Sequence, residues 1–290
     1  LLNLPKNMKL VFLTPIDIRD LGGGSLWFRT IPLFLSNKGI DTVVIYVEKT
    51  SSSNMKQYFD DEEDVNEKRK IRIHKLARFL KLPRGAAIPL PREVIRVLRE
   101  EISNANAVYF HYYPPFELFF KVIRKICYNY KTPIIAGIHL LPFDSWVSKM
   151  YLPMFFHNLA MFDAIHAPNK VLQRYISNSI KIKKPVFYVP NGIDTKEVER
   201  LRKNGWRQET KFKVLYAGRL TRDKGIDRLI NIVKRIAKLE LACNIEFVIA
   251  GDGPLRDKVI DLHSSYRELV RYVGRLPRKK LFKLYDNVHA

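Results

Sequence analysis

The stretch 215–230, LYAGRLTRDKGIDRLI, decides how the second half of the chain folds. An apolar run closes in Ala217-Gly218, a short polar turn follows, and a new apolar pattern with helical spacing starts at Ile226. A short apolar run of this kind is typical of a buried parallel strand, and the later spacing is typical of an amphipathic helix. The stretch therefore predicts a strand, a tight turn and a helix, which is the first part of a βαβ unit.

Two cations, Arg219 and Lys224, lie in that turn. A helix N-terminus carries positive partial charge, so two cations beside it fit a site where an anion such as a phosphate is bound between them. The same side chains are also explained as solvated charges on the surface of a basic protein. Spacing by itself leaves both interpretations open.

Strand and helix patterns alternate on both sides of this stretch. Upstream strands are expected at 8–16, 41–48, 106–114 and 133–141, with helical patterns between them. The alternation restarts after a polar segment. We expect an α/β protein with two doubly wound, Rossmann-like parallel sheets facing a cleft: a domain over 1–195, a linker over 196–210 and a second domain over 211–290.

Glycines follow several of these strands, where tight strand-to-helix turns need them and where backbone amides can approach a ligand closely. Each glycine can be explained either by the turn alone or by contact with a ligand. The donor or phosphate candidates are Gly23, Gly24, Gly251, Asp252, Gly253 and Arg275.

His139 closes an apolar strand of the first half, so it either lines the cleft or is a satisfied core histidine. The acidic block 60–64 lies in the least periodic part of the chain and is interpreted as a solvated loop within a mobile segment, 49–70.

The chain is strongly basic, with 51 Lys and Arg against 29 Asp and Glu and a net charge of +22. Such a field attracts nucleic acid, anionic membrane surfaces or phosphorylated small molecules. Cys127 and Cys243 have no metal-ligand spacing, and no apolar run is long enough to span a bilayer. We expect a cytoplasmic protein without a metal site, with aromatic and basic segments of the first half either in the core or lying on the inner face of a membrane.

The motifs NGID, YAGRLTRDKGIDRLI, FVIAGDGPLRDKV and YVGRLPRKKLFKLYDNVHA, in this order, resemble the nucleotide-sugar-binding domain of glycosyltransferase family 4. The segment GGG after the first strand and the histidine of GIHLLPF resemble that family's acceptor domain. These enzymes have the GT-B fold and retain the configuration of the transferred sugar. The resemblance covers nearly the whole chain.

The resemblance implies a role for each candidate. Arg219 and Lys224 would hold the donor diphosphate and stabilise its charge as the glycosidic bond breaks. His139 would lie near the transferred sugar, Gly23 and Gly24 near the donor phosphates or the acceptor. Four further residues would surround the nucleoside: Gly251, Asp252, Gly253 and Arg275.

The resemblance implies a retaining glycosyltransferase of the hexosyltransferase type that needs no metal ion. Its donor would be a UDP- or GDP-linked sugar, with no other cofactor, and its acceptor a glycan, a lipid-linked molecule or another compound. Synthesis of a cell-envelope glycan is one setting for it. The alternatives are a GT-B sugar-nucleotide epimerase or phosphorylase-like enzyme and, from another class, a basic nucleic-acid-binding protein. The nucleic-acid alternative has the charge in its favour but no interleaved aromatic motif.

The sequence departs from the family pattern at its C-terminal end. Family members carry an E-x7-E element whose carboxylates meet the donor sugar and ribose, and neither glutamate occurs before Ala290. We therefore expect an incomplete second domain, and the functional prediction applies to the full-length protein that this chain represents.

Overall fold

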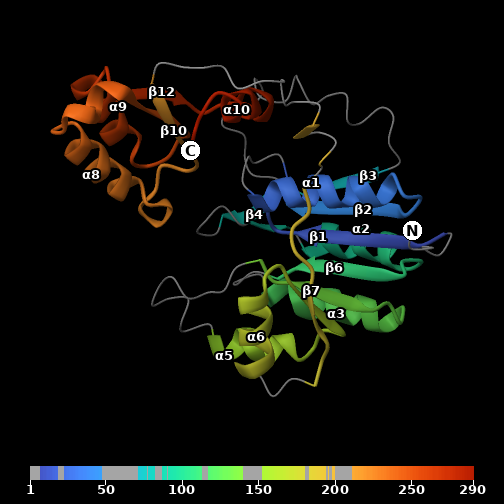
Figure 1. Ribbon diagram of the computed structural model, residues 1–290. Helices are drawn as coiled ribbons and strands as arrows, with labels where there is room; N and C mark the ends of the chain where they lie inside the picture. Colours follow the sequence, from blue (N-terminus) through green and yellow to red (C-terminus); the bar gives the residue numbers. More distant parts are fainter. Residues whose placement is uncertain are drawn as a thin grey trace. The chain divides into compact units, whose positions relative to one another are not determined.

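The computed structural model describes residues 7–18, 23–47, 71–76, 78–81, 87–89, 91–112, 117–139, 152–179, 183–193, 195, 198–199 and 211–290. The chain divides into two compact units, Leu1–Gly192 and Ile193–Ala290 (Figure 1). The acidic block 60–64 and almost all of the expected linker 196–210 lie outside the described residues, and the expected cleft between the domains stays a prediction.

A seven-stranded parallel sheet forms the first unit, in the order β3-β2-β1-β6-β7-β8-β9. The chain runs outward from β1 to β3 and then returns to place β6 on the other side of β1. Its strands are β1 (Lys9–Thr14), β2 (Asp41–Val47), β3 (Ile71–Leu76), β6 (Ala107–His111), β7 (Ile134–Gly137), β8 (Ala164–Ala167) and β9 (Val186–Tyr188). This order reverses between β1 and β6, which is where ligands bind in doubly wound sheets.

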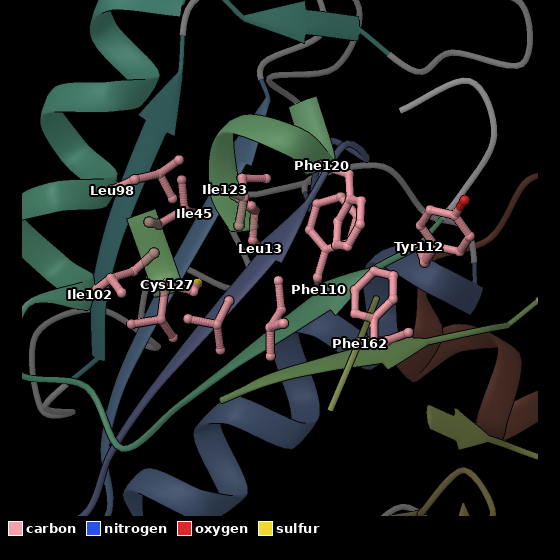
Figure 2. Close-up of a cluster of buried hydrophobic side chains, with 14 of the residues drawn as sticks. Leu13, Ile45, Leu98, Ile102, Phe110, Tyr112, Phe120, Ile123, Cys127 and Phe162 are labelled. Carbon is pink, nitrogen blue, oxygen red and sulfur yellow. The ribbon is translucent and has the colours of Figure 1, made fainter. Parts of the chain in front are cut away.

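Helices pack on both faces of this sheet because its strands are apolar on both faces, as expected for parallel strands. Val11 and Leu13 belong to a large core with α2 and α3, whereas Phe12, between them, packs with Phe28 of α1 in a separate core. Figure 2 shows the larger core, in which Phe110, Phe120 and Phe162 gather beside the aliphatic side chains. The helices are α1 (Gly23–Ser36), α2 (Pro91–Ile102), α3 (Glu117–Asn129), α5 (Leu152–Leu159) and α6 (Lys170–Ser179).

The sequence patterns miss the edge of this sheet. β3 has the sequence IRIHKL, and most of its side chains are exposed or half-buried. An edge strand needs few apolar residues, because one side of it meets solvent, so its pattern is weak. A small antiparallel pair, β4 (Arg78–Lys81) with β5 (Ala87–Pro89), is likewise absent from the sequence prediction.

Three parallel strands in the order β10-β11-β12 form the second unit's sheet. Its helical core partners are α8 and α9, whose Ile230, Val233 and Val259 pack on Phe247 and Val270 of the sheet. The elements are β10 (Phe212–Ala217), η4 (Arg222–Lys224), α8 (Ile226–Ile236), η5 (Glu240–Asn244), β11 (Ile245–Ala250), α9 (Arg256–Ser265), β12 (Val270–Gly274) and α10 (Arg278–Tyr285). Strand, short turn and helix thus follow the stretch 215–230 as predicted.

The other edge of β10 is also paired. The Ala290 amide donates to the Lys213 carbonyl at 3.2 Å, and the Leu215 amide donates to the Ala290 carbonyl at 2.6 Å. One residue bonded to both neighbours of its partner is the pattern of a parallel ladder. β10 therefore pairs in parallel with β11 on one side, and on the other side the single residue Ala290 bonds to it in the parallel pattern.

Among the helices that the structure describes, none is long and apolar enough to cross a membrane.

Candidate functional site

One row of side chains crosses four neighbouring strands of the first unit at their carboxyl ends. His111 of β6 is in register with Gly137 of β7, which is in register with His166 of β8. On the other side, His111 Nδ1 lies 3.0 Å from the Thr14 hydroxyl of β1. The row begins where the sheet order reverses, so these polar groups occupy the expected ligand-binding edge of the sheet.

Gly137 leaves a gap in this row, and the Tyr109 hydroxyl fills it. A Cβ atom built on Gly137 would overlap Oη of Tyr109, so only glycine admits that ring. Within the gap, Tyr109 Oη lies 3.0 Å from Nε2 of His139 and 2.6 Å from Nδ1 of His166. His166 in turn bonds the Val189 carbonyl through Nε2 at 2.7 Å. A continuous chain of hydrogen bonds therefore runs from His139 to the main chain after β9.

Aromatic rings of α1 cover this chain of hydrogen bonds. Trp27 stacks on Tyr109 with ring centroids 4.9 Å apart and packs edge-on against His139 at the same separation. Phe28 stacks on His111 with centroids 5.0 Å apart. α1 is the first helix after β1, and it places both rings over the row.

Burial shifts the protonation equilibria of the whole cluster toward neutral forms, because a low-dielectric environment disfavours charge. Burial, with a smaller contribution from His166, lowers the pKa of His139 to about 4. Burial also lowers the pKa of His166 and places the pKa of His111 well below its usual range. The pKa of Tyr109 is raised well above its ordinary value by the same effect. At neutral pH the three imidazoles and the phenol are uncharged.

Of the residues predicted in this half, the structure places His139 in the cluster just described and half-buried. The sequence interpretation missed Tyr109, His111 and His166. A signal for the two histidines is present: HYY and HAP, like the HLL of His139, place a histidine at or just after the carboxyl end of three successive strands.

Gly23 and Gly24 form the first residues of α1, where the amides of a helix have no partner within the helix. The Ser25 hydroxyl donates to the Asp17 carbonyl at 3.0 Å and so holds this helix start against the loop after β1. A Cβ on Gly23 would contact nothing within 4 Å, whereas one on Gly24 would lie 3.3 Å from Ile16 Cδ1. Open space at Gly23 leaves the close approach of a ligand there as a prediction.

In the second unit, Arg219 and Lys224 lie on the turn between β10 and α8, with both side chains exposed. Arg219 is 71% exposed, and its Nη2 lies 3.8 Å from the Asp223 carboxylate. The Tyr216 hydroxyl donates to the Arg219 carbonyl at 2.8 Å and lies 3.4 Å from the Lys224 carbonyl. One tyrosine thus holds the main chain of both cationic residues at the carboxyl end of β10.

Gly251 and Gly253 have a packing role that their prediction as donor contacts did not include. Both have positive φ, +155° and +157°, which side chains rarely adopt. A Cβ on Gly251 would overlap the Gly218 carbonyl, and one on Gly253 would lie 2.8 Å from the Leu220 carbonyl. These two glycines let the turn after β11 pack on the turn that carries Arg219.

The neighbouring predicted residues lie at the same end of the sheet. Asp252 is exposed, its carbonyl accepts from the Leu220 amide at 3.0 Å, and its carboxylate accepts from the Gly253 amide at 2.9 Å. Arg275 is exposed directly after β12 and Gly274, which has φ +68°. All predicted residues of this half therefore follow the carboxyl ends of β10, β11 and β12.

Within the described ranges, no group of three or more His, Cys, Asp or Glu side chains is arranged to hold a metal ion.

Comparison with known proteins first defines the class. A solved structure of Anabaena HepE in complex with UDP and glucose is 15% identical with a TM-score of 0.62, and the match covers 97% of this chain and 72% of that one. An S. aureus TarM variant with UDP bound is 9% identical with a TM-score of 0.62, covering 97% and 80%. A UDP-forming trehalose-phosphate synthase from Burkholderia xenovorans is 13% identical with a TM-score of 0.64, covering 97% and 78%. The chain thus has the two-domain GT-B fold, and it spans 72%, 80% and 78% of the length of these three solved chains, respectively. A search of curated proteins found no significant match.

Family models then place the chain more closely. Residues 22–197 match the model described as Glycosyltransferase Family 4, and residues 197–290 match the model described as Glycosyl transferases group 1. Together they span nearly the whole chain. The chain belongs to the family 4 glycosyltransferases, which confirms the predicted family.

Proposed function

We propose that this protein is a retaining, metal-independent glycosyltransferase that takes a sugar from a UDP- or GDP-linked donor to a glycan or lipid-linked acceptor. Similar structures with UDP bound, among them HepE and TarM, support a nucleotide sugar as the donor. Peripheral contact with a membrane and a cytoplasmic location belong to the same proposal, since the basic charge of +22 suits an anionic surface.

The observation that carries the proposal is the turn after β10. Its residues Arg219 and Lys224 have exposed cationic side chains, while Tyr216 holds their carbonyls. The first amides of α8 begin two residues after Lys224, so their unpaired N–H groups can bind the same anion. Two cations and a helix N-terminus are suited to a diphosphate leaving group.

Each of these groups stabilises negative charge as the glycosidic bond breaks. Charge on the diphosphate grows toward the transition state, so donors fixed in advance lower the barrier. His139, in the first unit, is neutral and suited to bonding a sugar hydroxyl, because its pKa of about 4 keeps it uncharged at neutral pH. With these parts, the protein's own side chains supply the charge stabilisation that a divalent ion supplies elsewhere.

The test begins with thermal shifts on addition of UDP, GDP, ADP and their sugars, because a ligand of the folded state raises its apparent stability. Arg219→Ala and Lys224→Ala should each weaken binding of the nucleoside diphosphate about tenfold to a hundredfold, as expected for the loss of a charge-assisted hydrogen bond. In transfer assays each should lose about 2 to 4 kcal/mol of transition-state stabilisation.

Arg222→Ala is the matched control. Arg222 lies in η4, between Arg219 and Lys224 in the sequence. Its side chain is 82% exposed, and its Nε lies 3.5 Å from the Asp227 carboxylate. We expect it to bind nucleoside diphosphates as the parent chain does. Equal binding by all three variants would contradict the diphosphate assignment, and transfer that is lost in chelator and restored by a divalent ion would contradict metal independence.

A further inference from the structure

The hydrogen bonds around Tyr109 determine which nitrogen of His139 carries the proton. His166 Nε2 lies 2.7 Å from the Val189 carbonyl, which can only accept, so this nitrogen carries a hydrogen. A neutral imidazole has one N–H group, and the other nitrogen is an acceptor. Nδ1 of His166 is therefore the acceptor, provided that the ring is neutral, which its burial favours.

The acceptor role of His166 Nδ1 then determines the donor and acceptor roles of Tyr109 and His139. Tyr109 Oη lies 2.6 Å from that acceptor nitrogen, so the phenol donates its single hydrogen to His166. Only lone pairs remain on Oη toward His139, whose Nε2 is 3.0 Å away. His139 must accordingly donate from Nε2, and its Nδ1 keeps a lone pair.

We propose that Val189, His166 and Tyr109 form a hydrogen-bond relay that fixes His139 as the Nε2–H tautomer and leaves Nδ1 as an acceptor for a substrate hydroxyl. The three are positioning residues that act through His139. The fixed tautomer follows from the hydrogen-bond geometry together with a neutral His166 ring, whereas the substrate hydroxyl rests on the proposed function.

Packing holds the relay in one arrangement. Gly137 admits the Tyr109 hydroxyl between the two imidazoles, because any Cβ there would overlap it. Trp27 covers the Tyr109 ring with centroids 4.9 Å apart. Rotation of the tyrosine out of the relay would therefore require α1 to move.

The direct test is the pattern of imidazole nitrogen signals in the ¹⁵N-labelled chain, since a protonated and an unprotonated ring nitrogen resonate far apart. Assignment uses the loss of one set of signals in His139→Gln and in His166→Gln. We expect His139 and His166 each to show a protonated Nε2 and an unprotonated Nδ1. A protonated Nδ1 on either ring in the parent chain would overturn the relay.

Tyr109→Phe keeps the ring stacked under Trp27 and removes only the hydroxyl. We expect His139 to become a mixture of tautomers in this variant, while His166, still bonded to Val189, keeps its own. Tyr112→Phe is the control, because it removes another buried tyrosine hydroxyl of the same segment outside the relay. An unchanged His139 pattern in Tyr109→Phe would contradict the relay.

A second variant tests the relay by closing the gap that the Tyr109 hydroxyl occupies. Gly137→Ala should displace the Tyr109 hydroxyl and give the same mixture for His139 as Tyr109→Phe, and an unaltered pattern would count against the relay. None of these measurements uses a nucleotide sugar. Failure of the relay thus leaves the proposed function untouched, and failure of nucleotide binding leaves the relay untouched.

Discussion

Acidification should destabilise the first unit because His139 is held there as a neutral imidazole. Burial lowers its pKa from 6.5 to about 4, so the folded state takes up a proton less readily than the unfolded state does. The stability that this histidine contributes is fully present above about pH 6.5 and is lost as the pH falls toward about 4. Stability falls with acidification because the unfolded chain binds more protons than the folded chain between about pH 6.5 and about pH 4.

The size of the effect follows from the same two values. The gap between 6.5 and about 4 corresponds to about 3 kcal/mol of unfolding free energy. His111 and His166, whose pKa values burial also lowers, add to the slope in the same direction. Since a typical domain has only about 5 to 15 kcal/mol of stability, acid should bring this unit close to unfolding.

Urea unfolding measured at several values between about pH 7 and about pH 4 would report this slope. His139→Gln removes the titrating group but keeps an amide near the position of Nε2, so its stability should fall less steeply with acidification, by up to about 3 kcal/mol over the interval. His157→Gln, which replaces an exposed histidine of α5, is the control. Parallel curves for the parent chain and His139→Gln would refute the burial of a neutral His139.

Three substitutions test a close backbone contact, a buried ion pair and, as its control, a more exposed ion pair. Gly251→Ala should destabilise the second unit by at least about 2 kcal/mol, because the new Cβ would overlap the Gly218 carbonyl and φ at this position is +155°. Urea unfolding measures this loss, and a midpoint equal to that of the parent chain would contradict the contact. Lys9→Met should cost about 3 kcal/mol, because the Lys9 ammonium lies 3.0 Å from the Glu101 carboxylate and both side chains are less than one-tenth exposed. Arg271→Ala, which removes a half-exposed ion pair with Glu246, should change the unfolding free energy by less than about 1 kcal/mol. An equal loss in Lys9→Met and Arg271→Ala would show that burial does not determine the contribution of an ion pair.

The alternation of apolar runs and helical patterns was sufficient to predict most of the central elements. β1, β2, β6, β7 and β11 lie where the runs predicted strands, because a strand with both faces covered must be largely apolar. β10 also lies where its run predicted a strand, although its side chains are half-buried or exposed and not buried as expected. β3 could not be found in this way, since most of its side chains are exposed or half-buried and polar residues suffice there. The family resemblance rested on short motifs at strand ends, and the family models confirm it.

What the sequence determined by itself is the set of positions at the carboxyl ends of strands, because glycine and charged residues interrupt apolar runs there. Arg219, Lys224 and His139 were found from that signal, and their binding roles stay predictions. What only the tertiary structure decided is which groups meet. Tyr109 and His166 are 57 positions apart, yet register and the gap at Gly137 bring their polar atoms within 2.6 Å. Pairing between strands, which no local pattern encodes, set the hydrogen-bond partner of His139, and burial in the folded unit keeps its imidazole neutral.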